Sequence, residues 1–260
     1  MIFRQLFDRS SCTYTYLIGC AETRLAVIID PVAELVNRDL TILGELDLEL
    51  KYVLETHVHA DHVTGAAALR QYTGAKNGLS KAACATCADL AFEHGDRIEF
   101  GHHTLTVRAT PGHTNGCITY VLEVEGQTFA FTGDAMMVRG CGRTDFQGGC
   151  AQTLYRSVRT QLFSLPPQTR IYPGHDYRGH QSTTIAEEMS YNPRLNLRVL
   201  EEDFVRMMAE LNLSDPKMMD VAVPANQACG VTDAFPAEFI RKKVVSITPD
   251  TLQTKHNYTI

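Results

Sequence analysis

The sequence predicts a mixed α/β domain that carries a helical extension at its C-terminal end. In the first 180 residues, short runs rich in β-branched and aromatic residues alternate with segments of helix-like apolar spacing. After residue 180 strand-like runs give way to helical spacing, at 181–191 and 197–211. We therefore expect a core over residues 1–180 and a helical extension over 181–260 that packs on this core, forming a single domain overall.

The expected elements of the core follow one another in short units. The N-terminal segment MIFRQLFDRSS indicates a first strand, and the run KYVLE at 51–55 indicates a short buried strand that leads directly into a histidine cluster. Further strands are expected at 13–20, 24–30, 103–110, 117–124, 127–132 and 170–172, and helices at 36–48, 65–72 and 152–162. The segment from residue 216 onward lacks clear periodicity, so we expect it to be irregular.

Composition and charge narrow the class of protein. The chain has 260 residues, of which 44% are hydrophobic and 21% charged, as in an ordinary globular protein with a sizeable core. Its formal net charge of −6 argues against a general role in binding nucleic acid or a membrane surface. No apolar run approaches the roughly 20 residues of a membrane-spanning helix, and no export or organelle address is visible. We therefore expect a cytoplasmic protein.

Seven residues able to bind a metal stand directly after expected strands. Four fall within six residues, and three follow in separate loops, each after a glycine that lets the backbone turn tightly. They are His57, His59, Asp61, His62, His113, Asp134 and His175. Taken singly, each of the last three is more simply a solvated loop side chain. Imidazoles and carboxylates at this density would repel or stay unsatisfied without a cation, so the joint pattern predicts a metal site.

The order of these motifs resembles that of a known superfamily. The run THVHADH at 56–62, followed by the loops of His113, Asp134 and His175, looks like the metallo-β-lactamase superfamily. The resemblance implies an α/β fold, a four-layer αββα sandwich with a short helical C-terminal extension, and a metal in the cleft at one edge of two facing sheets. Because one fold hosts many reactions, the superfamily alone does not fix the activity.

Two branches of this superfamily suit a site of glutathione size. One is the glyoxalase II type, a hydrolase of glutathione thioesters with two metal ions. The other is the persulfide dioxygenase type, also called sulfur dioxygenase, the family of the ethylmalonic-encephalopathy protein. Several segments resemble the second branch: TGDA at 132–135, RGCGRTDFQ at 139–147, PGHDY at 173–177, NPRL at 192–195 and VPANQACG at 223–230. The resemblance to persulfide dioxygenases then extends from residue 1 to about residue 230.

The persulfide dioxygenase resemblance implies one Fe(II) per chain, bound by His57, His113 and Asp134. Two histidines and one carboxylate on one face of the ion leave up to three coordination positions open for the substrate sulfur and O₂. The other four candidates then orient and tune the site from around these ligands instead of holding a second metal: His59, Asp61, His62 and His175. The implied reaction oxidises glutathione persulfide with O₂ and water to sulfite and glutathione, in sulfide detoxification.

Glutathione carries two carboxylates, so its site should offer fixed cations and hydrogen-bond donors. Arg143 and Tyr177 match positions that hold glutathione in related enzymes. Arg139 and Arg194 are further candidates, although a solvated surface arginine is an equally good interpretation of each. Cys229 is a candidate persulfide-carrying thiol, although a buried structural cysteine is the simpler interpretation. Relatives suggest a monomer or a homodimer.

The main rival is a two-metal glyoxalase II-type hydrolase. The sequence retains every residue of a two-metal site, so ligand identity does not separate the two activities. The flanking segments and the short C-terminal region favour the dioxygenase, since glyoxalase II enzymes usually append a larger helical substrate domain. A flavin-linked electron-transfer role is a distant third because no flavodoxin-like domain follows. About one iron per chain would favour the dioxygenase, and about two metals the hydrolase.

Overall fold

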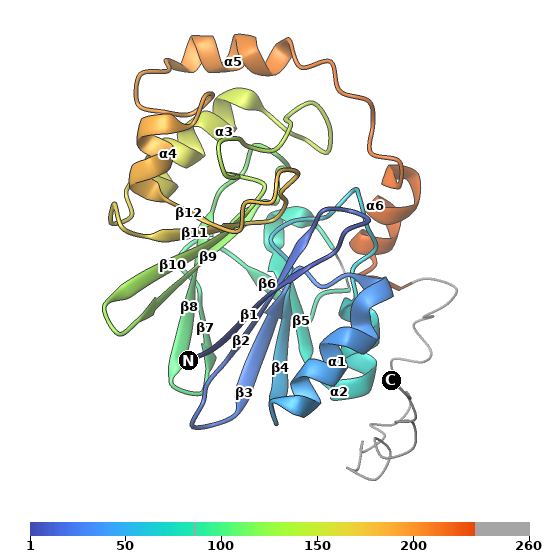
Figure 1. Ribbon diagram of the computed structural model, residues 1–260. Coiled ribbons are helices and arrows are strands. Elements are labelled where there is room, and N and C mark those ends of the chain that lie inside the picture. The colour runs from blue at the N-terminus through green and yellow to red at the C-terminus, as the bar shows by residue number, and fades with distance from the viewer. Residues whose placement is uncertain (86, 232–260) are drawn as a thin grey trace, which may run out of the picture.

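Two six-stranded β-sheets face each other in the computed structural model, which describes residues 1–85 and 87–231 (Figure 1). The first sheet has the order β1-β2-β3-β4-β5-β6, with strands Ile2–Phe7, Tyr14–Gly19, Leu25–Ile29, Glu49–Leu54, Lys76–Ser80 and Leu90–Phe92. The second has the order β12-β11-β10-β9-β8-β7, and β7 to β12 are Arg97–Phe100, His103–Ala109, Ile118–Val124, Gln127–Gly133, Arg170–Pro173 and Thr183–Thr184. Strands β3 to β6 are parallel, as is the pair β10–β11.

Large apolar side chains fill the space between the two sheets. In β8 the buried positions alternate with more exposed ones, so that Leu105 and Val107 point to the same side. They join a cluster that includes the fully buried rings of Tyr16, Tyr120 and Phe131. The two sheets therefore share one core, and the strand ends are fixed relative to one another.

Helices cover the outer face of each sheet and complete the four layers (Figure 1). Helices α1 (Val36–Glu45) and α2 (Ala66–Thr73) pack on the first sheet, where Leu43 and Leu69 join Val53. The second sheet is covered by α3 (Ala151–Ser157), its π-helical continuation Val158–Leu162 and α4 (Ile185–Tyr191). Helix α5 (Glu201–Ala209) packs on α3, where the rings of Tyr155 and Phe204 lie 5.7 Å apart. The predicted αββα sandwich is confirmed.

The structure corrects the prediction of an irregular tail, because residues that follow 216 form helix α6 (Met219–Gln227). Pro224 lies inside the helix, which weakens its sequence signal. Ala222 and Ala225 pack against Val63, so tertiary packing stabilises a segment of low intrinsic helicity. The rest of the predicted extension, 232–260, lies outside the described residues.

The strands β5, β6, β7 and β12 were not predicted, and β12 lies within the range 181–191 that was predicted as helix. They are short, and β5 contains a glycine, Gly78, against which the ring of Phe92 packs. A Cβ at Gly78 would lie 2.5 Å from that ring, so close packing rather than strand propensity determines the residue there. Among the described residues, no helix is long and apolar enough to cross a membrane.

Candidate metal centre

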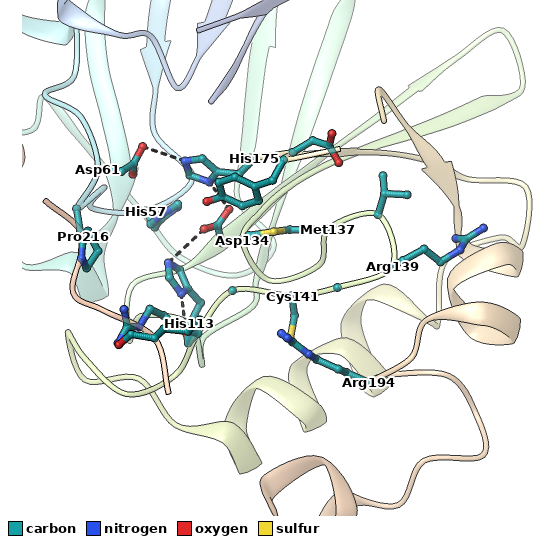
Figure 2. A pocket seen from close by; sticks show the side chains of 18 of the residues that line it. His57, Asp61, His113, Asp134, Met137, Arg139, Cys141, His175, Arg194 and Pro216 are labelled. Atoms are coloured by element: carbon teal, nitrogen blue, oxygen red, sulfur yellow. Dashed lines mark hydrogen bonds and ion pairs between the residues drawn. The ribbon is translucent and has the colours of Figure 1, made fainter. Parts of the chain in front are cut away.

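The candidate ligands gather at one end of the sandwich, where strands of both sheets end (Figure 2). His57 follows β4 of the first sheet, whereas His113 follows β8 and Asp134 follows β10 of the second. The turn before His113 requires glycine: Gly112 has a φ of 135°, and a Cβ there would lie 2.3 Å from the backbone of Leu154. Ligands that are distant in sequence are thus brought together by the rigid strand ends.

His57, His113 and Asp134 form the first group, in which one donor atom of each residue lies within 4.8 Å of the others. The Nδ1–H of His113 donates to the carbonyl oxygen of Arg143 at 2.7 Å, which leaves the Nε2 lone pair free. That Nε2 lies 3.5 Å from Asp134 Oδ2. His57 Nδ1 is 3.0 Å from the hydroxyl of Thr56, so its other ring nitrogen is also available.

The protonation states of the first group suit a cation. Burial lowers the pKa of both His57 and His113, so each imidazole is neutral near neutral pH. Burial alone would raise the pKa of Asp134, but His175, with the two other histidines, holds it well below its usual range. A buried carboxylate with two neutral imidazoles is a donor set that fits a divalent metal.

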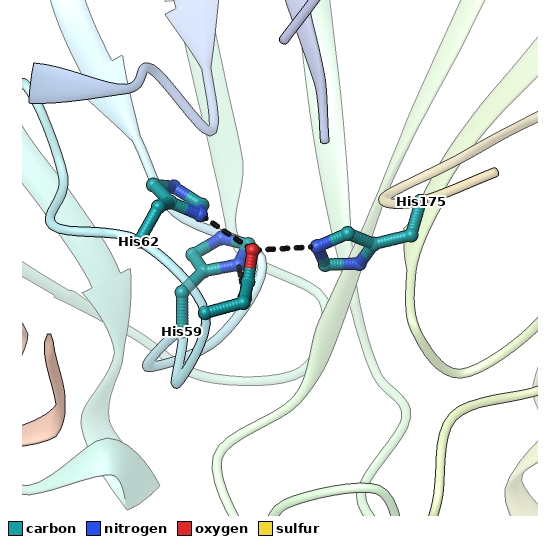
Figure 3. A group of neighbouring side chains, drawn as sticks. His59, His62 and His175 are labelled. Atoms are coloured by element: carbon teal, nitrogen blue, oxygen red, sulfur yellow. Dashed lines mark hydrogen bonds and ion pairs between the residues drawn. The ribbon is translucent and has the colours of Figure 1, made fainter. Parts of the chain in front are cut away.

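His59, Asp61, His62 and His175 form the second group, in which Asp61 is the hydrogen-bond partner of two of the histidines (Figure 3). Both ring nitrogens of His59 and the Nε2 of His62 are buried without a hydrogen-bond partner among the described residues. The Oδ2 of Asp61 lies 2.9 Å from His62 Nδ1 and 3.0 Å from His175 Nε2. It also accepts from the hydroxyl of Thr13 at 3.0 Å. Burial raises the pKa of Asp61, but His175 and His62 outweigh this effect and lower it strongly. This carboxylate is therefore ionised and already surrounded by donors.

His175 connects the second group to the first. Its Nδ1 lies 2.7 Å from Asp134 Oδ1, on the side opposite the contact with Asp61. Burial lowers the pKa of His175, but the carboxylates of Asp134 and Asp61 raise it well above its usual value. The ring is therefore an imidazolium held between two carboxylates, and it fixes the orientation of Asp134.

Two buried carboxylates that the sequence analysis missed contact the loop that carries His57 and His59. Asp30 follows β3, accepts from the backbone N–H of Thr56 at 2.7 Å, and lies 3.1 Å from His59 Nε2. Glu55 Oε2 lies 3.6 Å from the same nitrogen, and burial raises the pKa of Glu55 to about 8. Asp30 could have been found by the rule that located the other ligands, because it also stands directly after a strand. Glu55 could have been found in the same way, because it stands directly after β4.

A cavity of about 340 Å³ opens over the first group and is rich in cations. Its lining includes the predicted substrate contacts Arg139, Arg143, Tyr177 and Arg194 together with Arg178, which the sequence analysis did not single out. Tyr177 is 70% exposed, and its ring stacks parallel to that of His175 at 6.2 Å.

The arginines at this cavity differ in how strongly the protein already engages them. Arg139 forms an ion pair with buried Glu188, and its head group points away from the metal ligands (Figure 2). The guanidinium of Arg143 pairs with Asp145 at 2.6 Å. Arg194 lies beside Cys141 and forms no salt bridge within the described chain (Figure 2). Arg194 is therefore the more available cation, and Arg139 the less available one.

The structure corrects the expectation of a reactive thiol at Cys229. Its sulfur is bonded to Cys87 in a disulfide that spans 142 residues of sequence. A sulfur in a disulfide is not a nucleophilic thiol. Cys141 has a free thiol, but burial raises its pKa to about 11, so it is protonated and unreactive near neutral pH.

Comparison with known proteins agrees with this geometry. The family model of the metallo-beta-lactamase superfamily matches residues 13–175. The protein named persulfide dioxygenase ETHE1, mitochondrial, of Homo sapiens is 51% identical over 232 residues, which cover 89% of each chain. The crystal structure of ETHE1 from Myxococcus xanthus is 53% identical, with a TM-score of 0.85, covering 88% of this chain and 100% of that one. A hydroxyacylglutathione hydrolase of Cereibacter sphaeroides is 36% identical over 192 residues, or 73% of this chain and 72% of the relative.

The fold and the histidine-rich strand ends thus define a member of the metallo-beta-lactamase superfamily. Within it, this chain belongs to the persulfide dioxygenase family, because about half of the residues aligned over 89% of its length are identical to those of the mammalian relatives. The sequence-based identification is confirmed.

Proposed function

We propose that this chain is a glutathione persulfide dioxygenase that uses one Fe(II) per chain in sulfide detoxification. The reaction takes glutathione persulfide, O₂ and water, and gives glutathione and sulfurous acid, which ionises to sulfite. The terminal sulfur is oxidised, O₂ is reduced, and the sulfur–sulfur bond breaks with the glutathione thiol as leaving group. The identity of about half over 89% of the human persulfide dioxygenase carries this proposal.

His57, His113 and Asp134 would hold the iron, which supplies the redox chemistry when bound. This set of two histidines and one carboxylate is the one that non-haem Fe(II) oxygenases use, and it leaves positions for further ligands. The free Nε2 of His113 and the low pKa of Asp134 support this assignment. A second ion would have to displace hydrogen bonds that Asp61 already makes.

The cations of the cavity would bind the carboxylates of glutathione. Arg143 and Arg194 both line the cavity, and the exposed Tyr177 stacks its ring on that of His175. Arg139 would contribute less, because its guanidinium is already paired with Glu188. Arg178 adds a further positive charge at the rim.

The main alternative, a two-metal hydrolase of glutathione thioesters, is decided by one experiment. Protein loaded anaerobically with Fe(II) is mixed with glutathione persulfide, and O₂ uptake and sulfite are measured beside the hydrolysis of a glutathione thioester. We expect equal amounts of O₂ consumed and sulfite formed, with about one iron per chain. Thioester hydrolysis with two metals per chain and no O₂ uptake would overturn the proposal.

Compartment and assembly remain predictions. We propose a cytoplasmic enzyme that works as a monomer or homodimer, without nucleic-acid or membrane partners, although the names of the curated mammalian relatives include the word mitochondrial. Size-exclusion chromatography with light scattering tests the assembly state, and fractionation of the native cell tests the compartment.

A further inference from the structure

Helix α6 lies against the loop that carries the histidine run, and one side chain makes the polar contacts. The Nδ2 of Asn226 donates to the carbonyl oxygens of His59 at 2.9 Å and His62 at 2.8 Å. Its Oδ1 accepts from the backbone N–H of Thr64 at 2.8 Å. Asn226 is only 5% exposed, so both donors and one acceptor of its amide are committed to this loop in a dry environment.

The helix that presents Asn226 is itself held at two places. Ala222 and Ala225 pack against Val63, which lies within the same loop. Immediately after the helix, the Cys87–Cys229 disulfide ties its end to the segment that follows β5. The amide is therefore presented to the loop by a fixed support.

The contacts of the loop lead from this amide to a ligand of the first group. Asp61, between the two carbonyls that Asn226 binds, contacts His175 Nε2 at 3.0 Å. His175 Nδ1 in turn contacts Asp134 Oδ1 at 2.7 Å. A shift of the loop backbone would move Asp61 away from His175 and so loosen the ring that orients Asp134.

We propose that Asn226 is a positioning residue for the metal site, acting from the C-terminal segment through the backbone of the histidine loop. The inference rests on the metal site of the proposed function and adds a residue that is not itself one of the candidate ligands. Hydrogen bonds that orient ligands commonly change metal affinity about 10–100-fold when they are removed. The loss of Asn226 is expected to weaken metal binding more than substrate binding.

The test titrates metal-free wild type, Asn226→Ala and Asn226→Asp with Co(II), whose visible absorption reports coordination geometry. Both variants should bind Co(II) about tenfold more weakly or worse, with an altered absorption band. Asn226→Asp keeps the size of the side chain and the acceptor for Thr64 but loses the two donors, so it decides the question if the alanine variant does not fold. Thermal unfolding of each metal-free protein confirms that titrations are made on folded chains.

Asn196→Ala is the matched control. Its side chain also bonds the backbone, donating to the carbonyl oxygen of Asn192 at 2.7 Å and accepting from the N–H of Arg198 at 3.0 Å, but it lies in the segment between α4 and α5. This control should keep the wild-type Kd for Co(II) and the wild-type absorption band even if its melting temperature falls.

Wild-type Kd and absorption in both Asn226 variants would reduce Asn226 to a purely structural residue and overturn the inference. Wild-type protein that binds Co(II) but, once loaded with iron, oxidises no persulfide would remove the proposed function and leave the positioning role intact. A wild type that binds no metal would overturn both.

Discussion

The two histidine groups at the end of the sandwich contain the same kinds of side chain but use their hydrogen bonds differently. In the first group His113 places one ring nitrogen on a backbone carbonyl and keeps the other free. In the second group Asp61 is surrounded by three donors, and both ring nitrogens of His175 face carboxylates. In the first group a ring nitrogen of His113 is free, whereas in the second the Asp61 carboxylate is already engaged by three hydrogen-bond donors. The second group also keeps unpartnered nitrogens among the described residues, both of His59 and the Nε2 of His62.

This difference shows how one set of residues can serve two chemistries. The candidate ligands of two metal ions are present, and the two groups differ in how far their carboxylates are engaged. We call the first group the open set and the second group, whose carboxylate Asp61 already has three hydrogen-bond donors, the closed set. An ion in the first group replaces no hydrogen bond of His113, whereas an ion in the second must compete for Asp61 with the protein's own hydrogen-bond donors. We infer that the engagement of Asp61, rather than a lack of ligands, opposes a second metal ion in this chain.

The largest expected effect follows from removing a residue of the open set. His113→Ala deletes a neutral imidazole that nothing else at the site replaces, so we expect iron content to fall to background and persulfide oxidation to drop at least about 100-fold. Metal analysis measures the iron content, and O₂ uptake measures persulfide oxidation. The exposed His102, which pairs with Glu22 at 3.2 Å, gives the control His102→Ala, expected to behave as wild type. Full iron content in His113→Ala would break the comparison between the groups.

A smaller effect is expected in the closed set. His62→Ala removes one donor from Asp61 but leaves His175 and Thr13 in place, so the carboxylate stays ionised. We expect iron to remain near one per chain and kcat to fall about tenfold. Metal analysis of the purified variant is the decisive measurement. A drop from two metals to one would mean that the second group also holds an ion.

The candidate ligands of both sets could be predicted from the sequence, because strand ends and glycines carry a local signal. The run at 56–62 and the glycines before His113, Asp134 and His175 locate all seven candidates. The partners could not be predicted in the same way. Thr13 reaches Asp61 across 48 residues and Asn226 reaches the loop from more than 160 residues away, so only the folded chain shows them. The disulfide at Cys229 likewise depends on spatial proximity alone.

The third prediction distinguishes the role of the Arg143 backbone from the role of its side chain. Its carbonyl oxygen fixes His113, while its guanidinium lines the substrate cavity. Arg143→Ala keeps the carbonyl, so we expect iron content to stay at the wild-type level while KM for glutathione persulfide rises about tenfold, as for the loss of a charge-assisted contact. Steady-state kinetics beside metal analysis make the test. An unchanged KM would remove this side chain from the substrate site, and lost iron would show that it supports the open set.

Asp39 provides a reference carboxylate outside both groups, since its side chain has an arginine and no histidine as charged partner. It is fully buried in α1, and Arg38 donates to its Oδ1 at 2.8 Å. Burial outweighs that contact and raises the pKa of Asp39 to about 6. Histidine neighbours have the opposite effect on Asp134, whose pKa is lowered. The contrast attributes the low pKa of the site carboxylates to their imidazoles.

Asp39→Asn tests this contrast with the smallest expected effect. A carboxyl whose pKa is raised on folding favours the folded state fully below its unfolded value of 3.8, and that contribution is lost as the pH rises through about 6. Near pH 8 the wild type therefore buries a charge that the variant lacks, while the amide oxygen of the new side chain can still accept from Arg38. The rise of this pKa from 3.8 to about 6 corresponds to at most about 3 kcal/mol of unfolding free energy. The weakened contact with Arg38 in the variant reduces the gain to about 1 kcal/mol, or roughly 2–4 °C in Tm.

Melting curves of the metal-free wild type and Asp39→Asn make the measurement. They should show the variant more stable near pH 8 and the difference vanishing near pH 4, because both side chains are then neutral. A variant less stable than wild type near pH 8 would mean that the Arg38 ion pair outweighs burial. A single arginine would then stabilise the ionised form of Asp39 as the histidines stabilise that of Asp134.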